Sequence, residues 1–330
     1  MKSLRNSALV ITLLLAAIAA AQDKPFSISL DVAAVTVEAV VRDSGRILTD
    51  LTRDDFEVYE DGRRQEISSF VGVETPRSIL LLFDISGSTD GQRPFMVQAT
   101  NVFLANMKAQ DRIALASFAQ NLQMIMNWRS REGKSQDVKM PAPQFYSNVY
   151  SALEDAVSKF KNEKARKGLV VMTDGRDTPA LEDMLRQRRI PELETDSGFR
   201  KLVQNLKKQE IPIYFIALNT DRNPSPSVNG QEAMRIAAAM GPPAAEKYVE
   251  SVRRRMEHIA DVTGGRILFP RTLADVVPLY LAIGAELGAS YGLSYSPSNP
   301  VKDGKFRRIE VRVRKEGVKV TQSRDGYPAN

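Results

Sequence analysis

The chain has 330 residues, of which 43% are hydrophobic and 26% are charged, and it contains no cysteine. Its length and composition indicate a globular protein with a sizeable core, and the lack of cysteine excludes disulfides and thiolate metal sites. The formal net charge of +6 is too small to indicate a nucleic-acid-binding protein.

The amino terminus carries the pattern of an export signal. Lys2 and Arg5 precede an apolar run over residues 8–20 that ends in small residues. This arrangement predicts a signal peptide over residues 1–21, with cleavage near Ala21. The alternative, an uncleaved membrane anchor, is disfavoured because the run is shorter than the roughly 20 residues of a bilayer-spanning helix. We expect a secreted or periplasmic protein with no stable membrane span after cleavage.

Residues 22–76 are predicted to form a small amino-terminal β unit. Apolar residues alternate in much of the segment 28–37, which is the period of a half-buried strand. Turn signals follow at Ser44-Gly45 and Asp61-Gly62. The short strand expected before the second turn is weakened by Glu60, which occupies a position on its apolar face.

Residues 77–288 change to short, continuously apolar strands separated by amphipathic helices. This alternation is typical of a mostly parallel sheet with helices on both faces, the doubly wound α/β architecture. Two polar insertions, residues 178–198 and 219–243, are predicted to be long connecting loops. The predicted strands are Ile79–Phe83, Ile113–Phe118, Leu169–Met172, Ile213–Leu218 and Arg266–Phe269, with Leu122–Met126 as an antiparallel edge strand.

Residues 289–330 return to a β pattern. Tyr291, Leu293 and Tyr295 share one strand face, and after a turn rich in Pro, Asn and Gly a second apolar face begins at Ile309. The pattern predicts a carboxyl-terminal β hairpin. Each terminal segment alone has too few strands to bury its apolar face, so we expect the hairpin to pack with residues 22–76 in one small sandwich.

Oxygen-bearing side chains follow two of the predicted strands directly. Asp84, Ser86 and Ser88 come after the first strand, and Asp174 follows the strand Leu169–Met172. The carboxyl ends of parallel strands are where open α/β sheets bind ligands. Carboxylate and hydroxyl oxygens suit a hard ion such as Mg²⁺, Ca²⁺ or Mn²⁺ and offer no soft ligand for zinc or copper. The sequence therefore predicts a divalent metal site.

A fifth candidate ligand is Ser147, which stands in a loop before a predicted helix. The alternative is that Ser147 caps that helix and nothing more. For Asp84 and its serines, the alternative is an Asx-type turn with a helix cap. Two carboxylates that converge without a cation repel each other, which favours the metal site.

The motif Asp84-x-Ser86-x-Ser88, with Thr173-Asp174-Gly175 after a later strand, resembles the metal-ion-dependent adhesion site of von Willebrand factor type A domains. The resemblance covers about residues 77–287. It implies that Ser86 and Ser88 coordinate the ion directly, that Asp84 and Asp174 do so directly or through water, and that Ser147 replaces the family's usual threonine. The flanking segments 50–62 and 295–306 resemble exported bacterial proteins of the acidobacterial type that carry this domain.

The resemblance implies a protein-binding module and not an enzyme. Its ion, Mg²⁺ before Ca²⁺ or Mn²⁺, would accept an Asp or Glu carboxylate from a partner protein. One alternative is a structural or assembly module whose metal site is vestigial. Another is a phosphatase of the haloacid dehalogenase type with Asp84, Asp174 and Asp177 around magnesium, although Ser86 stands where that family needs an aspartate as general acid.

Overall fold

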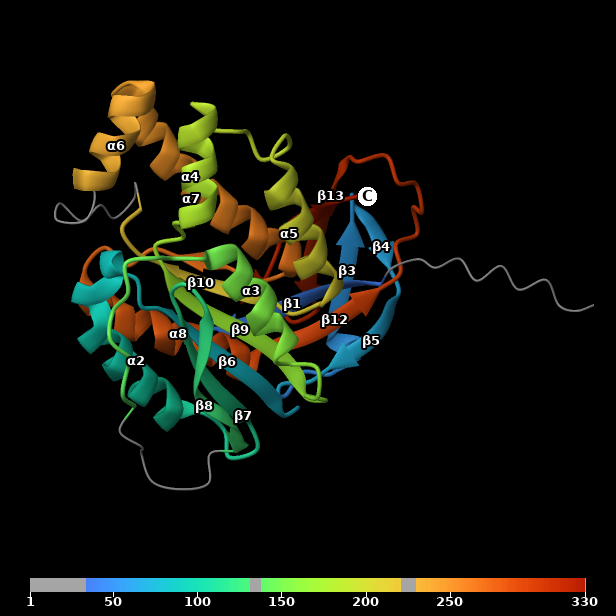
Figure 1. Ribbon diagram of the computed structural model, residues 1–330. Coiled ribbons are helices and arrows are strands. Elements are labelled where there is room, and N and C mark those ends of the chain that lie inside the picture. Colours follow the sequence, from blue (N-terminus) through green and yellow to red (C-terminus); the bar gives the residue numbers. More distant parts are fainter. Residues whose placement is uncertain (1–33, 131–137, 221–229, 330) are drawn as a thin grey trace, which may run out of the picture. The chain divides into compact units, whose positions relative to one another are not determined.

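The computed structural model describes residues 34–130, 138–220 and 230–329 (Figure 1). The predicted signal peptide lies outside the described residues. Among these residues, no helix combines the length and the apolar composition needed to cross a membrane.

A six-stranded sheet forms the centre of the fold, with strand order β11-β10-β9-β6-β7-β8. All neighbouring strands are parallel except β7 and β8, which are antiparallel. All eight residues of β6 are buried, which explains its unbroken apolar run. The mostly parallel sheet and the antiparallel edge strand are confirmed. The strands are β6 (Arg77–Asp84), β7 (Arg112–Phe118), β8 (Leu122–Ser130), β9 (Arg166–Thr173), β10 (Ile213–Ala217) and β11 (Ile267–Leu268).

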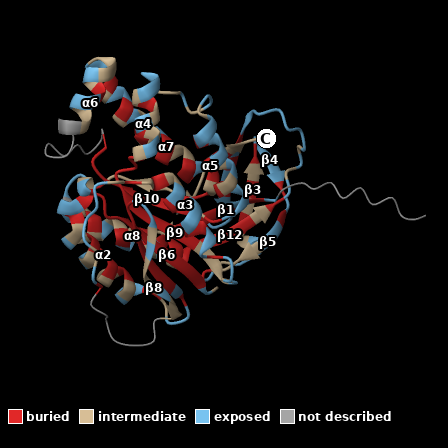
Figure 2. Cartoon of the chain, viewed as in Figure 1, coloured by how far each residue is buried: buried red, intermediate tan, exposed pale blue. Residues whose placement is uncertain are grey.

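Helices cover both faces of this sheet, and Figure 2 shows the buried residues along the strands between them. One face packs on α2 and α8, and the other packs on α3, α4, α5 and α7. The doubly wound α/β fold class is therefore confirmed. The helices are α2 (Arg93–Asn106), α3 (Val149–Ser158), α4 (Thr178–Gln187), α5 (Ser197–Lys208), α6 (Gly230–Met240), α7 (Pro243–Thr263) and α8 (Val276–Ala289), with the short 3-10 helices η1 (Arg53–Asp55), η2 (Gly87–Gln92) and η3 (Leu273–Asp275).

The prediction of a long loop over residues 178–198 is wrong, because α4 and the start of α5 occupy most of it. The Asp177 carboxylate accepts a hydrogen bond from the Ala180 backbone N–H at 2.9 Å and so caps α4. Leu181 and Met184 are buried three residues apart, on one helical face. The many charged residues of this segment hid a short amphipathic helix.

The predicted loop over residues 219–243 is also partly helical. Residues 221–229 lie outside the described part of the chain, and α6 begins at Gly230. Ile236 of α6 is buried in the core of the α3 face, which gives this helix a packed side. The turn-forming and charged residues of this insertion suggested a loop from the sequence.

The terminal segments form two antiparallel sheets. In the first, β1 pairs with β12, β14 and β2, and β12 also pairs with β5. In the second, β3 lies between β13 and β4, and β15 pairs with β13. The strands are β1 (Val35–Asp43), β2 (Arg46–Ile47), β5 (Ile67–Val71), β12 (Tyr291–Tyr295) and β14 (Val318–Gln322) in the first sheet, and β3 (Phe56–Glu60), β4 (Arg63–Gln65), β13 (Phe306–Val313) and β15 (Gly326–Pro328) in the second.

The two sheets share one apolar core to which both ends of the described chain contribute, and we call them together the β unit. Val37, Val58 and Tyr291 are all buried in this core. The prediction of a carboxyl-terminal hairpin is wrong in one respect, because β12 and β13 lie in different sheets and do not pair. The accessory β unit itself is part of the fold class and is confirmed.

Glu60 is buried at the end of β3, where it weakened the strand pattern. Its Oε2 accepts hydrogen bonds from the hydroxyls of Tyr295 and Tyr327, each at 2.8 Å. Both tyrosines belong to the carboxyl-terminal segment. A buried charge is tolerated where hydrogen-bond donors satisfy it. The Glu60 carboxylate, which weakened the strand pattern in the sequence, therefore connects the amino-terminal and carboxyl-terminal segments.

A buried polar cluster connects the β unit to the amino ends of the central strands. The Arg166 guanidinium at the start of β9 lies 2.6 Å from a Glu38 carboxylate oxygen of β1. The Ser290 hydroxyl donates to Glu38 at 2.6 Å, and the Ser290 carbonyl accepts from Arg77 and Arg166 at 3.1 and 3.0 Å. Burial, followed by the nearby Arg166 charge, lowers the pKa of Arg77 to about 10.

We predict that Arg166→Ala lowers the free energy of unfolding by about 3 kcal/mol, because it leaves the buried Glu38 carboxylate without its ion-pair partner. The matched control is Arg186→Ala, which removes an exposed ion pair to Asp183 on α4 and should cost no more than about 0.5 kcal/mol. Urea denaturation of the two variants measures both values. Equal losses in the two variants would contradict the coupling role of this cluster.

Candidate metal centre

The candidate site lies where the direction of chain winding reverses. From β6 the chain crosses through α2 on one face to β7, and after β8 it returns through α3 on the other face to β9. Neighbouring connections that leave on opposite faces open a crevice at the carboxyl ends of the two strands between them. Those strands are β6 and β9, which end at Asp84 and just before Asp174.

Asp84 is completely buried and accepts hydrogen bonds on both carboxylate oxygens. Oδ1 accepts from the Ser86 backbone N–H at 2.9 Å, which forms the Asx-type turn that the sequence offered as the alternative to a metal site. Oδ2 accepts from the Thr173 hydroxyl at 2.6 Å and from the Ser147 hydroxyl at 3.4 Å. Burial, followed by repulsion from Asp174, raises the pKa of Asp84 to about 7. The site therefore favours a positive charge beside this carboxylate.

Ser86 and Ser88 place their hydroxyl oxygens side by side, 3.1 Å apart. The loop that carries them is fixed by Thr89, whose hydroxyl donates to the carbonyls of Asp84 and Ser86 at 2.7 and 3.0 Å. Ser86 is buried, Ser88 is half-buried and Gly87 between them is exposed. The pair of hydroxyls thus stands at the outer side of the crevice, with Asp84 beneath.

Ser147 lies beside Asp84 and does not cap α3. The residue at the amino-terminal cap of α3 is Asn148, and no side-chain hydrogen bond is made there. The Ser147 backbone N–H donates to the Thr178 hydroxyl oxygen at 3.0 Å, and the Ser147 carbonyl accepts from the Thr178 N–H at 2.7 Å. The hydroxyl of Ser147 is therefore held at the site from a third loop.

Asp174 contributes a carboxylate with one oxygen that makes no hydrogen bond. Its Oδ1 accepts from the Arg176 backbone N–H at 3.1 Å. Its Oδ2 is buried without a hydrogen-bond donor, and the Arg176 guanidinium lies 3.8 Å from it. A buried carboxylate oxygen without a donor is rare and lowers the stability of the fold, and a bound cation would remove this penalty.

Three residues at the site were not singled out from the sequence. Thr173 bonds Asp84, and Arg176 faces Asp174 while its Nε lies 3.2 Å from Glu232 of α6. Burial opposes the charge of Arg176, but Asp174 and Glu232 outweigh it and raise its pKa. Asn219, just after β10, donates to the Ser88 carbonyl at 2.9 Å. Their positions in the sequence could have identified these three residues, since each stands at or shortly after the end of a central strand.

The oxygen set fits a hard divalent cation. Two carboxylates and three hydroxyls from three loops converge, and one carboxylate oxygen has no donor. Among the described residues, no group of three or more His, Cys, Asp or Glu side chains gathers as a metal site, here or elsewhere. A site that depends on hydroxyls has too few carboxylates to form such a group.

Asp177, the third carboxylate of the phosphatase alternative, is committed to helix capping. Its oxygens accept from the backbone N–H groups of Ala180 and Tyr150 at 2.9 and 3.0 Å, at the starts of α4 and α3. Burial raises its pKa. Asp177 thus orients two helices next to the candidate site, and both of its carboxylate oxygens already accept backbone hydrogen bonds.

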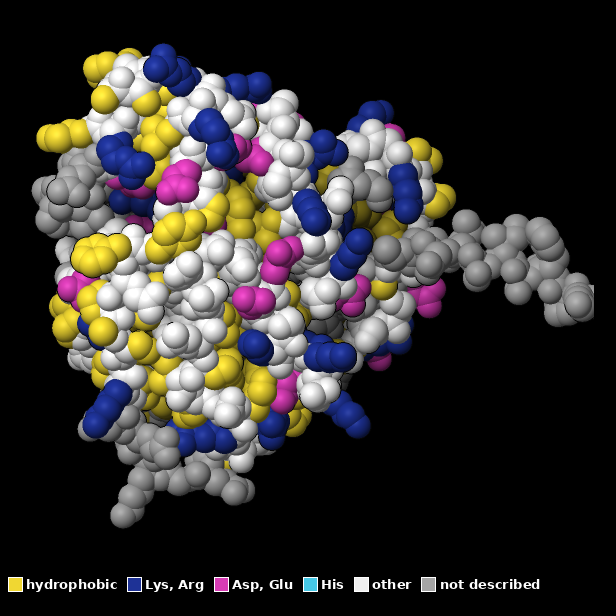
Figure 3. Space-filling view, in the orientation of Figure 1, with side chains coloured by type: hydrophobic (Ala, Val, Ile, Leu, Met, Phe, Trp, Pro, Cys, Tyr) yellow, Lys and Arg dark blue, Asp and Glu magenta, His cyan; other side chains and the backbone are white. Residues whose placement is uncertain are grey.

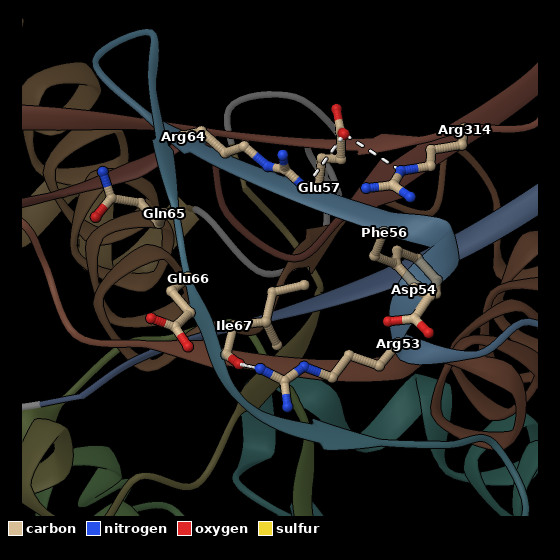
Figure 4. A pocket seen from close by; sticks show the side chains of 9 residues that line it. All are labelled: Arg53, Asp54, Phe56, Glu57, Arg64, Gln65, Glu66, Ile67 and Arg314. Carbon is tan, nitrogen blue, oxygen red and sulfur yellow. Dashed lines mark hydrogen bonds and ion pairs between the residues drawn. The ribbon is translucent and has the colours of Figure 1, made fainter.

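A pocket of about 390 Å³ lies in the β unit, at η1, β3 and the β4–β5 corner. Figure 4 shows Arg64 and Arg314 directed toward Glu57, which lies 3.4 and 3.3 Å from them. Arg53 donates to the Ile67 carbonyl. Three arginines and three acidic residues line the pocket, so its charges are balanced. We assign it no ligand.

The fold is that of a doubly wound α/β domain, and its oxygen cluster, where the chain winding reverses, makes a candidate cation site. Residues 77–226 match the family model described as von Willebrand factor type A domain. This segment, a little under half of the chain, is therefore similar to von Willebrand factor type A domains. A comparison with curated protein sequences finds no match.

Several solved structures are similar to this chain at low sequence identity. A von Willebrand factor type A protein from Catenulispora acidiphila has a TM-score of 0.49 at 12% identity, over 82% of this chain and 71% of that chain. The pilus adhesin SpaC from Lactobacillus rhamnosus GG has 0.47 at 11%, over 71% and 34%. Proximal thread matrix protein 1 from the mussel byssus, with a zinc-occupied MIDAS motif, has 0.42 at 13%, over 69% and 49%. The chain thus spans half or less of the last two proteins.

We predict that Gly175→Ala is more destabilising than Gly62→Ala, although both glycines have a positive φ of +75° and +78°. A Cβ on Gly175 would lie 2.6 Å from the Met256 sulfur, whereas a Cβ on Gly62 would meet open space. Gly62→Ala should cost about 1 kcal/mol through backbone strain, and Gly175→Ala about 1–2 kcal/mol more through overpacking. Thermal unfolding compares them, and equal losses would contradict the close packing beneath Asp174.

Proposed function

We propose that this protein is an exported, metal-dependent protein-binding module and not an enzyme. Asp84, Ser86, Ser88, Ser147 and Asp174 would hold a divalent ion, Mg²⁺ before Ca²⁺ or Mn²⁺. A bound ion would supply an open coordination position that attracts an outside carboxylate. The partner is accordingly a protein that presents an Asp or Glu side chain.

The observation that carries this proposal is the buried Asp174 oxygen without a hydrogen-bond donor. It stands at the same sheet edge as Asp84 and the paired hydroxyls of Ser86 and Ser88. Two carboxylates with neutral hydroxyls leave a divalent ion little excess negative charge, so the ion stays attractive to a further anion. Von Willebrand factor type A domains are usually binding modules without catalysis, which agrees with this assignment.

The rest of the site serves to hold these oxygens in place. Thr173 and the Ser86 backbone fix the orientation of Asp84, and Thr89 fixes the serine loop. The Ser88 hydroxyl is half-buried and Gly87 is exposed. A partner would therefore approach over the serine loop.

A second candidate function is a structural or assembly module in which Arg176 takes the place of the ion. The guanidinium already lies 3.8 Å from the Asp174 oxygen and 3.2 Å from Glu232. A built-in cation offsets the repulsion between Asp84 and Asp174 without metal. The two candidates differ in what the removal of Arg176 does, as described below.

We propose export from the signal pattern of residues 1–21, with a secreted or periplasmic location. The segments around residues 50–62 and 295–306 support membership of the exported bacterial, acidobacterial-type group. Edman sequencing or mass spectrometry of the protein secreted by a bacterial host tests export. A mature chain that retains Met1 would contradict it.

We predict saturable binding of Mg²⁺, Ca²⁺ or Mn²⁺ to the metal-stripped mature protein, and its loss in Asp174→Asn. This substitution keeps the side-chain shape but removes a charged ligand, so binding should weaken at least about tenfold. Calorimetric titration, with Zn²⁺ included, measures it. The matched control is Asp183→Asn on the exposed face of α4, which should bind as the parent does. No saturable binding by the parent protein would favour the structural module.

We predict that Arg176→Gln tightens Mg²⁺ binding on the order of tenfold, because it removes a positive charge 3.8 Å from a ligand carboxylate. Arg186→Gln, on an exposed pair of α4, is the control and should leave the affinity unchanged. If Arg176 instead replaces the ion, Arg176→Gln destabilises the protein and no metal restores its stability. Titration and thermal unfolding with and without Mg²⁺ distinguish the two results.

A further inference from the structure

Phe145 is a fully exposed aromatic side chain, with a relative exposure of 104%. It belongs to neither apolar core of the domain and to none of the partly buried residues packed against them. A solitary exposed aromatic ring gains nothing for folding, whereas aromatic side chains are enriched among the residues that dominate binding energy at protein interfaces. Its position decides whether it has such a role.

The loop that carries Phe145 is fixed on both sides of the ring. The Gln144 backbone N–H donates to the Ile85 carbonyl at 3.0 Å, and Gln144 forms a bridge with Ser86. The Asn148 backbone N–H donates to the Ala119 carbonyl at 2.8 Å. The ring is therefore presented by an anchored loop, and its presentation costs a partner little ordering entropy.

Phe145 also lies beside the serine loop of the candidate metal centre. A Cβ built on Gly87 would lie 3.8 Å from Cδ1 of the Phe145 ring and 3.8 Å from the Gln144 carbonyl. Gly87 stands between Ser86 and Ser88, the two hydroxyl ligands of the proposed site. Figure 3 shows hydrophobic side chains over η2 and the loop before α3 on this face of the molecule. The ring thus lies at the rim of the cation site.

We propose that Phe145 is the apolar anchor of the partner-binding surface and selects an acidic segment with an aromatic or large aliphatic residue one or two positions from its metal-bound carboxylate. This inference rests on the proposed function. Consecutive residues of an extended segment are about 3.3–3.6 Å apart, so a carboxylate over the serine loop brings its neighbours to the ring. Contact between the two apolar groups excludes water from the edge of the site.

Gly87 suits a binding surface because its lack of a side chain leaves the approach to the neighbouring hydroxyls of Ser86 and Ser88 unobstructed. Gly87 has no positive φ, so its backbone does not require glycine. A side chain there would fill the space between Ser88 and the ring. Because Gly87 has no side chain, an extended segment of a partner could contact both the serine hydroxyls and the exposed ring.

Two short synthetic peptides, coupled densely to a sensor surface, test the proposal with the full mature protein and Mg²⁺. Both carry one aspartate; one has phenylalanine next to it and the other has alanine. We expect the phenylalanine peptide to bind roughly tenfold more tightly. Phe145→Ser should remove this preference, and Phe145→Leu should restore most of it. Phe306→Ser, which removes an exposed ring of the β unit, is the control and should keep it.

The outcomes separate this inference from the proposed function. Metal-dependent binding of both peptides with equal affinity would overturn the role of Phe145 and leave the metal-dependent module intact. Binding of neither peptide above the level of Asp174→Asn would overturn both. A phenylalanine preference that survives EDTA would show an apolar surface unconnected with the cation site and would also overturn the inference. Unchanged thermal unfolding of Phe145→Ser confirms that the variant is folded.

Discussion

Asp84 and Asp174 are two carboxylates held almost entirely away from water at the ends of neighbouring parallel strands. Like charges so placed repel each other, and burial adds to the cost of ionising them. The surrounding residues reduce this repulsion and the cost of burial in two ways. Hydroxyls of Thr173 and Ser147 donate to Asp84, and the Arg176 guanidinium stands near Asp174. The donor-free oxygen of Asp174 remains, and in this account a divalent ion completes the balance.

The β unit holds the same two strands, β6 and β9, at their opposite ends. Arg77 and Arg166 begin β6 and β9, and both donate to the Ser290 carbonyl while Arg166 pairs with Glu38 of β1. The strands that carry the two carboxylates at their carboxyl ends are thus tied at their amino ends to a second, independently packed core. A fixed relation between β6 and β9 is what a site built from both requires, because a misplacement of about 1 Å is costly at a preorganised site.

Much of this arrangement could be predicted from the sequence, because buried parallel strands have unbroken apolar runs and Asp84 and Asp174 stand directly after two of them. The errors arose where many charges obscured a short helix and where the decisive contacts are distant in sequence. The helix α4 depends on its Asp177 cap and on two buried residues among many charges. The separation of β12 from β13 into different sheets depends on partners more than 200 residues away. Arg176 followed the motif directly, but only the folded chain shows that it faces Asp174.

The proposed divalent ion lies in the space between Asp174 and the hydroxyls of Ser86 and Ser88. Crystals of the mature protein grown with Mn²⁺ and measured at the manganese absorption edge test this position. We predict one anomalous peak there, with oxygens of Ser86, Ser88 and an acidic side chain about 2.0–2.4 Å away, and a shift of the Arg176 guanidinium away from Asp174. Full Mn²⁺ in the solution without a peak there, and with Arg176 still beside Asp174, would contradict it.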